Sequence, residues 1–430
     1  MIKRVTLNDL FGRFCYDIAL KDGGVTIITG PNGFGKSTIL KIINALSGMD
    51  FSYFNKIDFN EIYVEFDNGK DLKVLKNEEG LLFNDLKCDV SSLIINGNEF
   101  DDYIRYATSI SRWSRDTYMD RKTRTKISTD DLLQYLIVNY EESLSELERY
   151  ASNSFKQIID LFKEMKEWCG EVRLISEQRL IKTENQRNDE ERIIDVISEL
   201  PSQLKAEINM VYSEYSKVAN SLDGSYPKRL FAAKEGISNE TDFKNKLEET
   251  NIKFNNLIKY GLVDMKIIER TSYNDKFAEA LKIYFDDFSE KYAVFEVLIK
   301  KLDLFTQIIN ERLTFKEIKI SRQNGFEVVD IDNKDRSLML SQLSSGEKQE
   351  IVLFYDLIFN TKSELLLLID EPEISLHISW QKKFMDDLLK VAEDNNIQII
   401  VATHSPQIIN NHWEIQIDLG ERYHEQLNKK

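Results

Sequence analysis

The stretch Gly30-Pro31-Asn32-Gly33-Phe34-Gly35-Lys36-Ser37-Thr38 fits the pattern G-x-x-x-x-G-K-[ST] of a phosphate-binding loop, here called the phosphate loop. The apolar run 25–29 before it predicts a short buried strand, and residues 37–46 after it carry apolar side chains at helical spacing. Strand, loop and helix therefore follow one another in the order that the motif requires. The alternative is a glycine-rich turn followed by a surface lysine.

The chemistry of the phosphate loop predicts ATP and Mg²⁺ as cofactors. Its glycines let backbone N–H groups approach phosphate oxygens, and the helix N-terminus adds its positive dipole end. Lys36 is expected to reach the β- and γ-phosphates, and the Ser37 hydroxyl to coordinate Mg²⁺. The loop residues expected to contact the nucleotide are Asn32, Gly33, Gly35, Lys36, Ser37 and Thr38.

Composition indicates a soluble protein of two or three domains. The chain has 430 residues, 42% of them hydrophobic, and its basic and acidic residues give a net charge of 57 − 73 = −16. Such a surface does not as a whole suit a polyanion. No C-x-x-C pair occurs, no signal peptide begins the chain, and the most apolar run, 365–369, is too short to span a bilayer. We therefore expect a cytoplasmic location and no membrane contact.

The two ends of the chain show strand patterns. Residues 1–85 are predicted as a β-rich lobe around the phosphate loop, with strands at 2–7, 14–20, 25–29, 61–66 and 72–75. Residues 315–430 begin with a hairpin around Asn324-Gly325 and then alternate helix (from about 346), strand (365–369), helix (380–391) and strand (397–401). That alternation predicts a parallel sheet.

The middle of the chain is predominantly helical in pattern. Residues 86–170 are predicted as a helical insertion, 171–180 as a strand that returns to the core, and 181–314 as a helical or coiled-coil arm. In 274–313 the apolar residues recur about every 3.5 positions, which favours one helix of roughly 60 Å. An antiparallel arm, a dimerisation element and an ordinary helical subdomain all fit. The expected turns between the helices are at Gly224, Pro227 and Gly236.

One basic cluster stands out in this acidic chain. The segment Arg112–Lys126 holds six basic residues interleaved with Trp113 and Tyr118, opposed only by Asp116 and Asp120. DNA or an acidic protein could dock there, with the aromatic rings stacking on bases. A solvated helix end or loop is the alternative.

An apolar strand, 365–369, ends in Asp370-Glu371. Together with Lys36, this pattern predicts that Asp370 holds Mg²⁺ and that Glu371 orients the attacking water and accepts its proton. The chain is therefore predicted to be a Mg²⁺-dependent ATPase.

The segment Leu343-Ser344-Ser345-Gly346-Glu347 resembles the L-S-G-G-Q/E signature of the ABC-class ATPases, which include the SMC, Rad-fifty and RecF branches, although it departs at Ser345 and Glu347. The resemblance implies an α/β fold: an ABC-type P-loop head made of both chain ends, with a mixed sheet, a β-rich N-terminal lobe and a large helical insertion. It also implies a homodimer or higher homo-oligomer, closed by an ATP sandwich. In that assembly Ser344, Ser345 and Gly346 of one protomer bind the γ-phosphate held by another.

The same resemblance extends to three further positions. Val401-Ala402-Thr403-His404-Ser405-Pro406 is similar to the switch-histidine segment, which implies that His404 contacts the γ-phosphate and the catalytic region. Gln178 is the candidate for the glutamine that senses the metal and the γ-phosphate. The adenine-stacking aromatic would be Phe11 or Phe14.

The insertion between the phosphate loop and the signature is longer than in transporter ATPase subunits and shorter than in full SMC proteins, which points to one group within the ABC class. With Asp370-Glu371-Pro372-Glu373 and Thr403-His404-Ser405-Pro406, the chain is similar to the OLD-like (overcoming lysogenization defect) ATPases, whose members occur in antiviral systems such as Septu and PARIS. OLD nucleases proper carry a Toprim domain after the ATPase. Only 26 residues follow His404, so the resemblance implies a separate effector, a nuclease or toxin.

Three functions remain open. The preferred one is an ATPase that acts as sensor and regulator of an antiviral system and controls that effector. The second is a RecF- or SMC-like ATPase of DNA repair or DNA binding. The third is a nucleotide-gated scaffold in which turnover is incidental.

Overall fold

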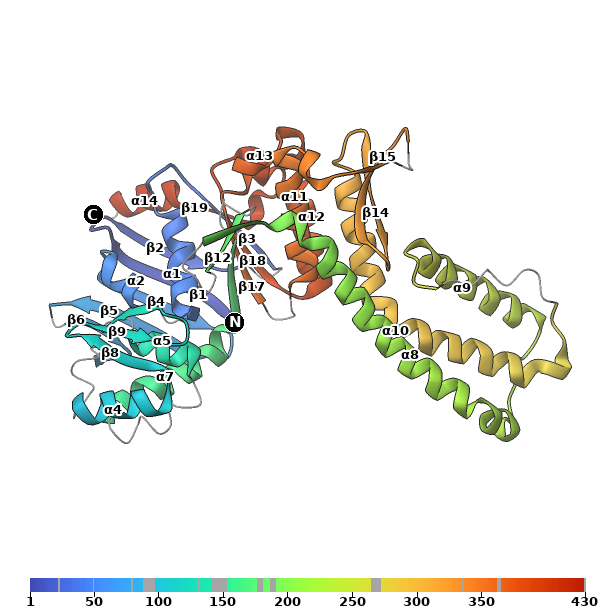
Figure 1. The fold of residues 1–430 in the computed structure, drawn as a ribbon. Coiled ribbons are helices and arrows are strands. Elements are labelled where there is room, and N and C mark those ends of the chain that lie inside the picture. The colour runs from blue at the N-terminus through green and yellow to red at the C-terminus, as the bar shows by residue number, and fades with distance from the viewer. Residues whose placement is uncertain are drawn as a thin grey trace. The chain divides into compact units, whose positions relative to one another are not determined.

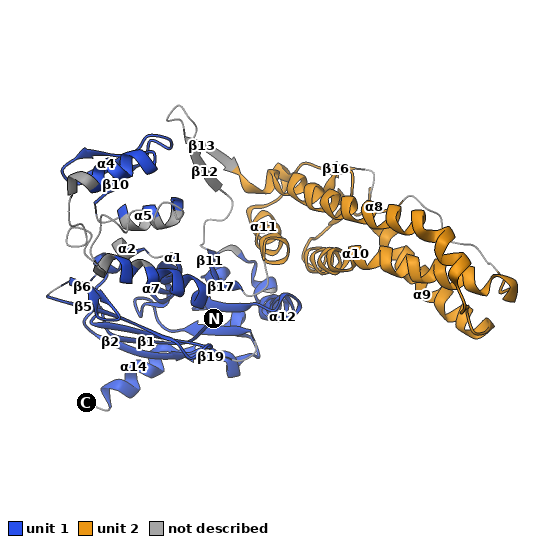
Figure 2. Ribbon diagram, turned by 90° about the horizontal axis from the view of Figure 1, so that it is seen from below, with its two compact units in different colours: residues 1–177, 362–430 blue, residues 178–361 orange. Residues whose placement is uncertain are grey.

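The structure, a computed structural model, describes residues 1–21, 24–48, 50–78, 80–87, 97–129, 132–140, 153–175, 181–185, 191–263, 272–333, 336–361 and 365–428. The chain forms two compact units (Figure 2). Unit 1 contains residues 1–177 and 362–430, and unit 2 contains residues 178–361.

A five-stranded parallel sheet is the centre of unit 1. Its order is β11–β17–β18–β3–β19, with bounds β11 (Glu171–Ile175), β17 (Leu365–Asp370), β18 (Gln398–Ala402), β3 (Val25–Thr29) and β19 (Gln416–Asp418). This confirms the parallel sheet predicted from the alternating pattern. Since parallel strands end at one edge, the residues that follow β3, β17 and β18 meet there.

The second sheet of unit 1 is antiparallel and confirms the predicted β-rich lobe. Its order is β2–β1–β4–β5–β6–β7, with bounds β1 (Ile2–Leu10), β2 (Phe14–Ala19), β4 (Glu61–Phe66), β5 (Asp71–Asn77), β6 (Gly80–Phe83) and β7 (Leu86–Lys87). Burial alternates from residue to residue along β2 and β4, so each strand buries one side.

Helix α1 (Lys36–Gly48) joins the two sheets of unit 1 in one core. Its buried side chains Ile39, Ile42 and Ile43 belong to a hydrophobic cluster that also contains residues of β1, β4, β17 and β18. Burial of this face fixes the helix whose first residues close the phosphate loop. Unit 1 also contains the helices α2 (Phe51–Lys56), α7 (Asn153–Cys169), α12 (Ile378–Asn395), α13 (Pro406–Ile409) and α14 (Leu419–Leu427).

The prediction of a wholly helical segment 86–170 is wrong in its middle. After α4 (Gly97–Ala107), the chain forms a small antiparallel sheet of β8 (Ile110–Ser114), β9 (Thr117–Asp120) and β10 (Lys126–Ser128), followed by α5 (Leu132–Asn139). Ile110, Tyr118 and Ile127 are buried. Strands of three to five residues contain too few alternations to show a period of two, so the helical pattern of the following residues dominated the prediction.

Unit 2 is built on three helices, α8 (Leu200–Ala232), α9 (Glu240–Lys259) and α10 (Ala278–Asn310), and α8 and α10 pack along each other (Figure 1). The turns expected at Gly224 and Pro227 do not form, because α8 runs through both. Arg229 explains why: its Nη2 donates to the carbonyl of Leu222 at 2.8 Å, and its guanidinium pairs with both carboxylate oxygens of Asp287 on α10. This anchoring holds the helix past a proline that cannot donate to the carbonyl of Asp223.

The rest of unit 2 confirms the predicted hairpin and signature helix. Strands β14 (Lys316–Ser321) and β15 (Gly325–Asp330) pair around the Asn324-Gly325 turn, β16 (Ser337–Leu338) adds a third strand, and α11 (Ser345–Phe359) follows. Gly325 has φ +72, and a Cβ there would lie 1.9 Å from the carbonyl oxygen of Pro201, so only glycine fits. The prediction of a helical arm over 181–314 is wrong at its start, where β12 (Ile181–Asn185) and β13 (Glu191–Asp195) form a short hairpin. Strands of five residues contain too few alternations to stand out beside the long helical pattern that follows. Among the described helices, none has both the length and the apolar character to cross a membrane.

Candidate active site

The phosphate loop has the backbone conformation that its sequence predicts. Gly30, Gly33 and Gly35 have φ of 146°, 86° and 87°. Lys36, only 5% exposed, donates from Nζ to the carbonyl of Gly30 at 2.9 Å and to that of Pro31 at 3.4 Å. The ammonium is thus held against the loop, where it can meet an anionic ligand. Asn32 and Gly33 are exposed at the loop tip, and Thr38 is half-buried in α1.

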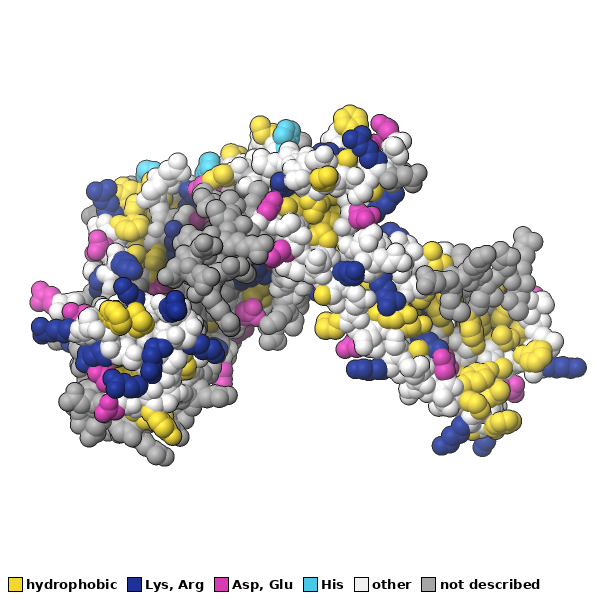
Figure 3. Space-filling model, viewed as in Figure 1, with side chains coloured by type: hydrophobic (Ala, Val, Ile, Leu, Met, Phe, Trp, Pro, Cys, Tyr) yellow, Lys and Arg dark blue, Asp and Glu magenta, His cyan; other side chains and the backbone are white. Residues whose placement is uncertain are grey.

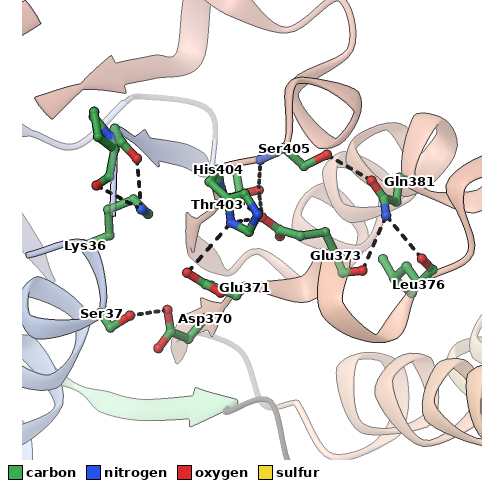
Figure 4. Close-up of polar contacts among 12 residues, drawn as sticks. Lys36, Ser37, Asp370, Glu371, Glu373, Leu376, Gln381, Thr403, His404 and Ser405 are labelled. Atoms are coloured by element: carbon green, nitrogen blue, oxygen red, sulfur yellow. Dashed lines mark hydrogen bonds and ion pairs between the residues drawn. The ribbon is translucent and has the colours of Figure 1, made fainter. Parts of the chain in front are cut away.

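The Ser37 hydroxyl and the Asp370 carboxylate meet between α1 and the end of β17. Ser37 Oγ donates to Asp370 Oδ1 at 2.9 Å (Figure 4). Mg²⁺ in nucleotide sites is held by one or two protein oxygens together with phosphate oxygens and water. A hydroxyl and a carboxylate oxygen beside a phosphate loop fit that donor set.

Glu371 turns the chain sharply at the end of β17. It has a left-handed backbone, φ 43° and ψ 59°, and its N–H donates to the carbonyl of Ala402 at 2.9 Å. A non-glycine residue in this region is strained, and such residues concentrate at functional sites. The turn directs the carboxylate of Glu371 away from that of Asp370, towards His404 (Figure 4).

His404 lies against two carboxylates. Its Nδ1 is 3.0 Å from Oε1 of Glu373 and 3.8 Å from Oε1 of Glu371. Its backbone N–H donates to Oε1 of Glu373 at 2.8 Å, and Thr403 Oγ1 donates to the same oxygen at 2.6 Å. The side chain of His404 is 49% exposed, so the ring remains accessible although its backbone is fixed by the bond to Glu373.

Gln381 on α12 closes this network. Its Nε2 donates to the carbonyls of Glu373 and Leu376, at 3.3 and 3.1 Å, and its Oε1 accepts from Ser405 Oγ at 2.9 Å (Figure 4). Neither Glu373 nor Gln381 was predicted from the sequence as a site residue. The motif Asp370–Glu373 contains Glu373, but its partners lie some thirty residues later and only the fold unites them.

The signature segment begins α11 in unit 2. Ser344 caps the helix: its Oγ accepts from the N–H of Glu347 at 3.3 Å, and Glu347 Oε2 accepts from the N–H of Ser344 at 2.8 Å. Lys316 Nζ contacts both oxygens of Glu347 at 2.8 and 2.9 Å. Burial raises the pKa of Glu347, but the bonds from Lys316 and Ser344 outweigh it and lower the pKa. Ser344 and Ser345 are exposed and Gly346 is half-buried, so the helix start is open to a ligand.

The remaining candidates differ in outcome. Gln178 lies outside the described residues. Phe14 is buried in an aromatic cluster with Phe34 and Tyr423, at centroid distances of 5.3 and 5.2 Å. Phe11 is 40% exposed and, at φ 56°, lies beside Gly35 of the phosphate loop. Of the two aromatic candidates, Phe11 is therefore the one accessible to an adenine ring.

The basic cluster lies on β8–β10 and their turns, where Figure 3 shows Lys and Arg side chains gathered. Arg112 is committed internally, with Nη1 2.9 Å from Asp101 Oδ2 and its guanidinium over the ring of Tyr118. Trp113 is 65% exposed at a bulge between β8 and β9. The other basic residues of the cluster are all exposed: Arg115, Arg121, Lys122, Arg124 and Lys126.

Comparisons with known proteins give one family and several distant relatives. A family model described as "AAA ATPase domain" matches residues 1–409. The chain is 23% identical over 416 residues to a spermidine/putrescine import ATP-binding protein of Mycoplasma genitalium, covering 91% of this chain and 69% of that protein. It is 37% identical over 105 residues to the "Retron Ec83 probable ATPase" of Escherichia coli, covering 22% of this chain and 19% of that one.

Among solved structures, a Smc head domain with an extended coiled coil, bound to the C-terminal domain of ScpA and derived from Pyrococcus furiosus, is 14% identical. The alignment covers 95% of this chain and 91% of that chain, with a TM-score of 0.37.

Proposed function

The chain belongs to the AAA ATPase domain family and is an ATPase, and we propose that it acts as the sensor and regulator of a bacterial antiviral system. The motif resemblance to the OLD-like ATPases carries the defence part of this proposal. The controlled effector, a nuclease or toxin, is on a separate chain. ATP-dependent closure of a homodimer or larger homo-oligomer switches it.

One observation supports the catalytic part of the proposal above all others. Ser37 Oγ and Asp370 Oδ1 lie 2.9 Å apart beside the phosphate loop, and Glu371 follows directly. We assign Ser37 and Asp370 as the residues that would hold Mg²⁺. When bound, the ion would neutralise charge on the phosphates. Lys36 binds the β- and γ-phosphates. Glu371 orients water and accepts its proton, and His404 contacts the γ-phosphate side of the site.

The regulatory part can be tested with the chain and the products of its neighbouring genes. The tagged Glu371→Gln variant, which is expected to hold ATP, should co-purify with the effector in the presence of ATP and Mg²⁺. Lys36→Ala should give a different amount of complex, because it cannot reach the ATP-bound state. Equal complex formation by both variants, and no effect of ATP on effector activity, would reject nucleotide control.

The basic sheet favours a second candidate, a DNA-responsive ATPase. Five exposed cations next to an exposed tryptophan suit a phosphate backbone with stacked bases. Stimulation of ATP turnover by DNA would favour this function over control of a protein effector.

A further inference from the structure

We propose that Glu373 is a positioning residue for ATP hydrolysis: it holds the proton-bearing Nδ1 of His404 and keeps that ring from pairing with Glu371. This inference rests on the proposed catalytic site. It assigns a role to a carboxylate that neither contacts the phosphate loop nor belongs to the predicted metal site.

Glu373 is a buried carboxylate with two hydrogen-bond donors and the His404 ring nitrogen directed at one oxygen. Its side chain is only 6% exposed. Oε1 accepts hydrogen bonds from Thr403 Oγ1 and the His404 backbone N–H, at 2.6 and 2.8 Å, and lies 3.0 Å from His404 Nδ1. Because this oxygen accepts two hydrogen bonds, we expect the ring nitrogen beside it to be the donor in their contact. Burial of a carboxyl group is costly unless it is hydrogen-bonded, and these contacts offset that cost.

The position of this oxygen sets the protonation pattern of the His404 ring. An acceptor at Nδ1 favours the ring form with a proton on Nδ1, which leaves Nε2 as the atom available on the exposed side of the imidazole. Oε2 of Glu373 is buried and has no hydrogen-bond partner among the described residues. In glutamine, an amide N–H₂ group takes the place of one of the two carboxylate oxygens. In the place of Oε2 this group would have no described acceptor, and in the place of Oε1 it would face the donors of Thr403 and His404.

Glu373 also competes with Glu371 for the histidine. Nδ1 is 3.0 Å from the first carboxylate and 3.8 Å from the second. Without Glu373, the nearest described carboxylate to Nδ1 is Glu371. A bond there would compete with water for the carboxylate that must accept its proton. Glu373 therefore preserves the base by giving the histidine another partner.

The clamp by Gln381 keeps the two segments in register. It binds the backbone carbonyl of Glu373 and the hydroxyl of Ser405, the residue after His404. Thr403 is fully buried, and its N–H donates to the carbonyl of Ile28 in β3 at 3.0 Å. The histidine is thus fixed relative to the strand that leads into the phosphate loop.

A spectroscopic test does not depend on turnover. The chain has four histidines, so selective ¹⁵N-histidine labelling gives few ring signals. The signals that disappear in His404→Ala belong to His404. In the unmodified protein at neutral or higher pH, we expect the neutral His404 ring to carry its proton on Nδ1. Glu373→Gln should shift it towards the mixture of ring forms seen for free histidine. A proton on Nε2 in the unmodified protein, or no change in Glu373→Gln, would overturn the proposal.

A kinetic cycle tests the role in hydrolysis. Glu373→Gln should lower kcat about 10–100-fold, as loss of a partner that orients a functional histidine typically does, with the Kd for ATP unchanged. Combined with His404→Ala, it should change kcat less than about twofold, because Glu373 acts through that ring. Equal losses with and without His404 would overturn the proposal.

The control is Asp386→Asn, which alters another histidine–carboxylate pair of unit 1, His412 Nε2 to Asp386 Oδ1 at 2.7 Å, and should leave kcat unchanged. If Glu373→Gln does not fold, Glu373→Asp takes its place in the cycle, since it withdraws the carboxylate from His404 by one methylene. Lack of turnover in the unmodified protein above that of Lys36→Ala would instead reject the proposed catalytic site. The ring measurement would still decide the histidine contact.

Discussion

Ser37 Oγ donates to Asp370 Oδ1 at 2.9 Å, although the two residues lie 333 positions apart. The contact joins the first turn of α1 to the end of β17. Because parallel strands end at the same edge of the sheet, two motifs that are far apart in the sequence meet there, with oxygen ligands of the kind that Mg²⁺ and phosphate sites use.

Asp370→Asn should weaken the use of Mg²⁺, because an amide oxygen is a poorer ligand for a hard cation than a carboxylate. We expect the Mg²⁺ concentration for half-maximal ATPase activity to rise roughly 10-fold or more. A Mg²⁺ titration of the hydrolysis rate measures this. Asp394→Asn, an exposed carboxylate on α12, is the control and should leave the midpoint unchanged. The same midpoint in both variants would remove Asp370 from the metal site.

Lys36→Ala should weaken ATP binding by roughly one to two orders of magnitude or more, which is the scale of a lost hydrogen bond to a charged group. Calorimetric titration with ATP and Mg²⁺ checks the prediction. Lys41 is exposed on the same helix, so Lys41→Ala is the matched control and should bind normally. Unchanged affinity in Lys36→Ala would contradict the assignment of the phosphate loop.

Asp120 holds the basic turn of the small sheet and gives that part of unit 1 a pH dependence. Burial raises the pKa of Asp120, but hydrogen bonds from Ser109, Tyr135, Tyr140 and the Lys122 N–H outweigh it and lower the pKa to about 2. A carboxyl whose folded pKa is lowered stabilises the fold above its unfolded pKa and loses this contribution as pH falls through the folded one. Asp120→Asn should therefore destabilise the protein at pH 6.

That stability difference should shrink between about pH 4 and pH 2, where Asp120 becomes protonated in both states. Thermal unfolding of the unmodified protein and of Asp120→Asn across this range checks the window. A difference that is constant with pH would mean that the variant acts through packing alone.

The basic cluster is predicted to bind an anionic partner. Replacing Arg121, Lys122 and Arg124 with Gln should weaken DNA binding. It should also reduce the slope of log K against log salt by up to about 2–3, if all three side chains contact phosphates. Fluorescence anisotropy with labelled single- and double-stranded DNA measures both quantities. The control removes the same charge from α8 with Gln at the exposed residues Lys205, Lys217 and Lys228. Equal salt slopes in the two triple variants would make the cluster a solvated surface.

The sequence predicted the site best where local chemistry is complete within a motif. The phosphate loop needs its own glycines, so Gly30 and Gly35 have the positive φ that their pattern implies. Likewise, the apolar run before Asp370 forms the buried strand β17. In contrast, the acceptor of the His404 N–H is a side chain 31 positions earlier, and no local pattern records that distance.

Fold predictions failed where tertiary contacts outweighed local signals. Pro227 usually ends or kinks a helix, yet α8 continues because Arg229 is fixed by Asp287 on another helix. The strands β8 and β9 are short and joined by charged turns, and they are held by the burial of Tyr118 and Asp120. A single-sequence pattern contains neither the partner helix nor the buried face.

Glu371→Gln should bind ATP normally and hydrolyse it very slowly. Asp370 is bonded to Ser37 and assigned to the metal, so Glu371 is the neighbouring group able to accept a proton from water. The amide keeps the shape of the side chain but not its basicity, and loss of a positioned base typically lowers the rate 10²–10⁴-fold. ATP should then persist in the site.

A persistent γ-phosphate should also hold two protomers together, if Ser344 and Gly346 of one contact the phosphate bound by the other. Size-exclusion chromatography with light scattering, with and without ATP, should show Glu371→Gln accumulating as a dimer or larger particle. Adding Ser344→Arg should return it to the mass seen without ATP, because the exposed helix start of α11 would be blocked by a bulky cation. The same mass in every condition would exclude ATP-driven assembly through the signature. A turnover assay of Ser344→Arg then identifies a constitutive oligomer: lost activity would keep the signature in the site, and normal activity would remove it.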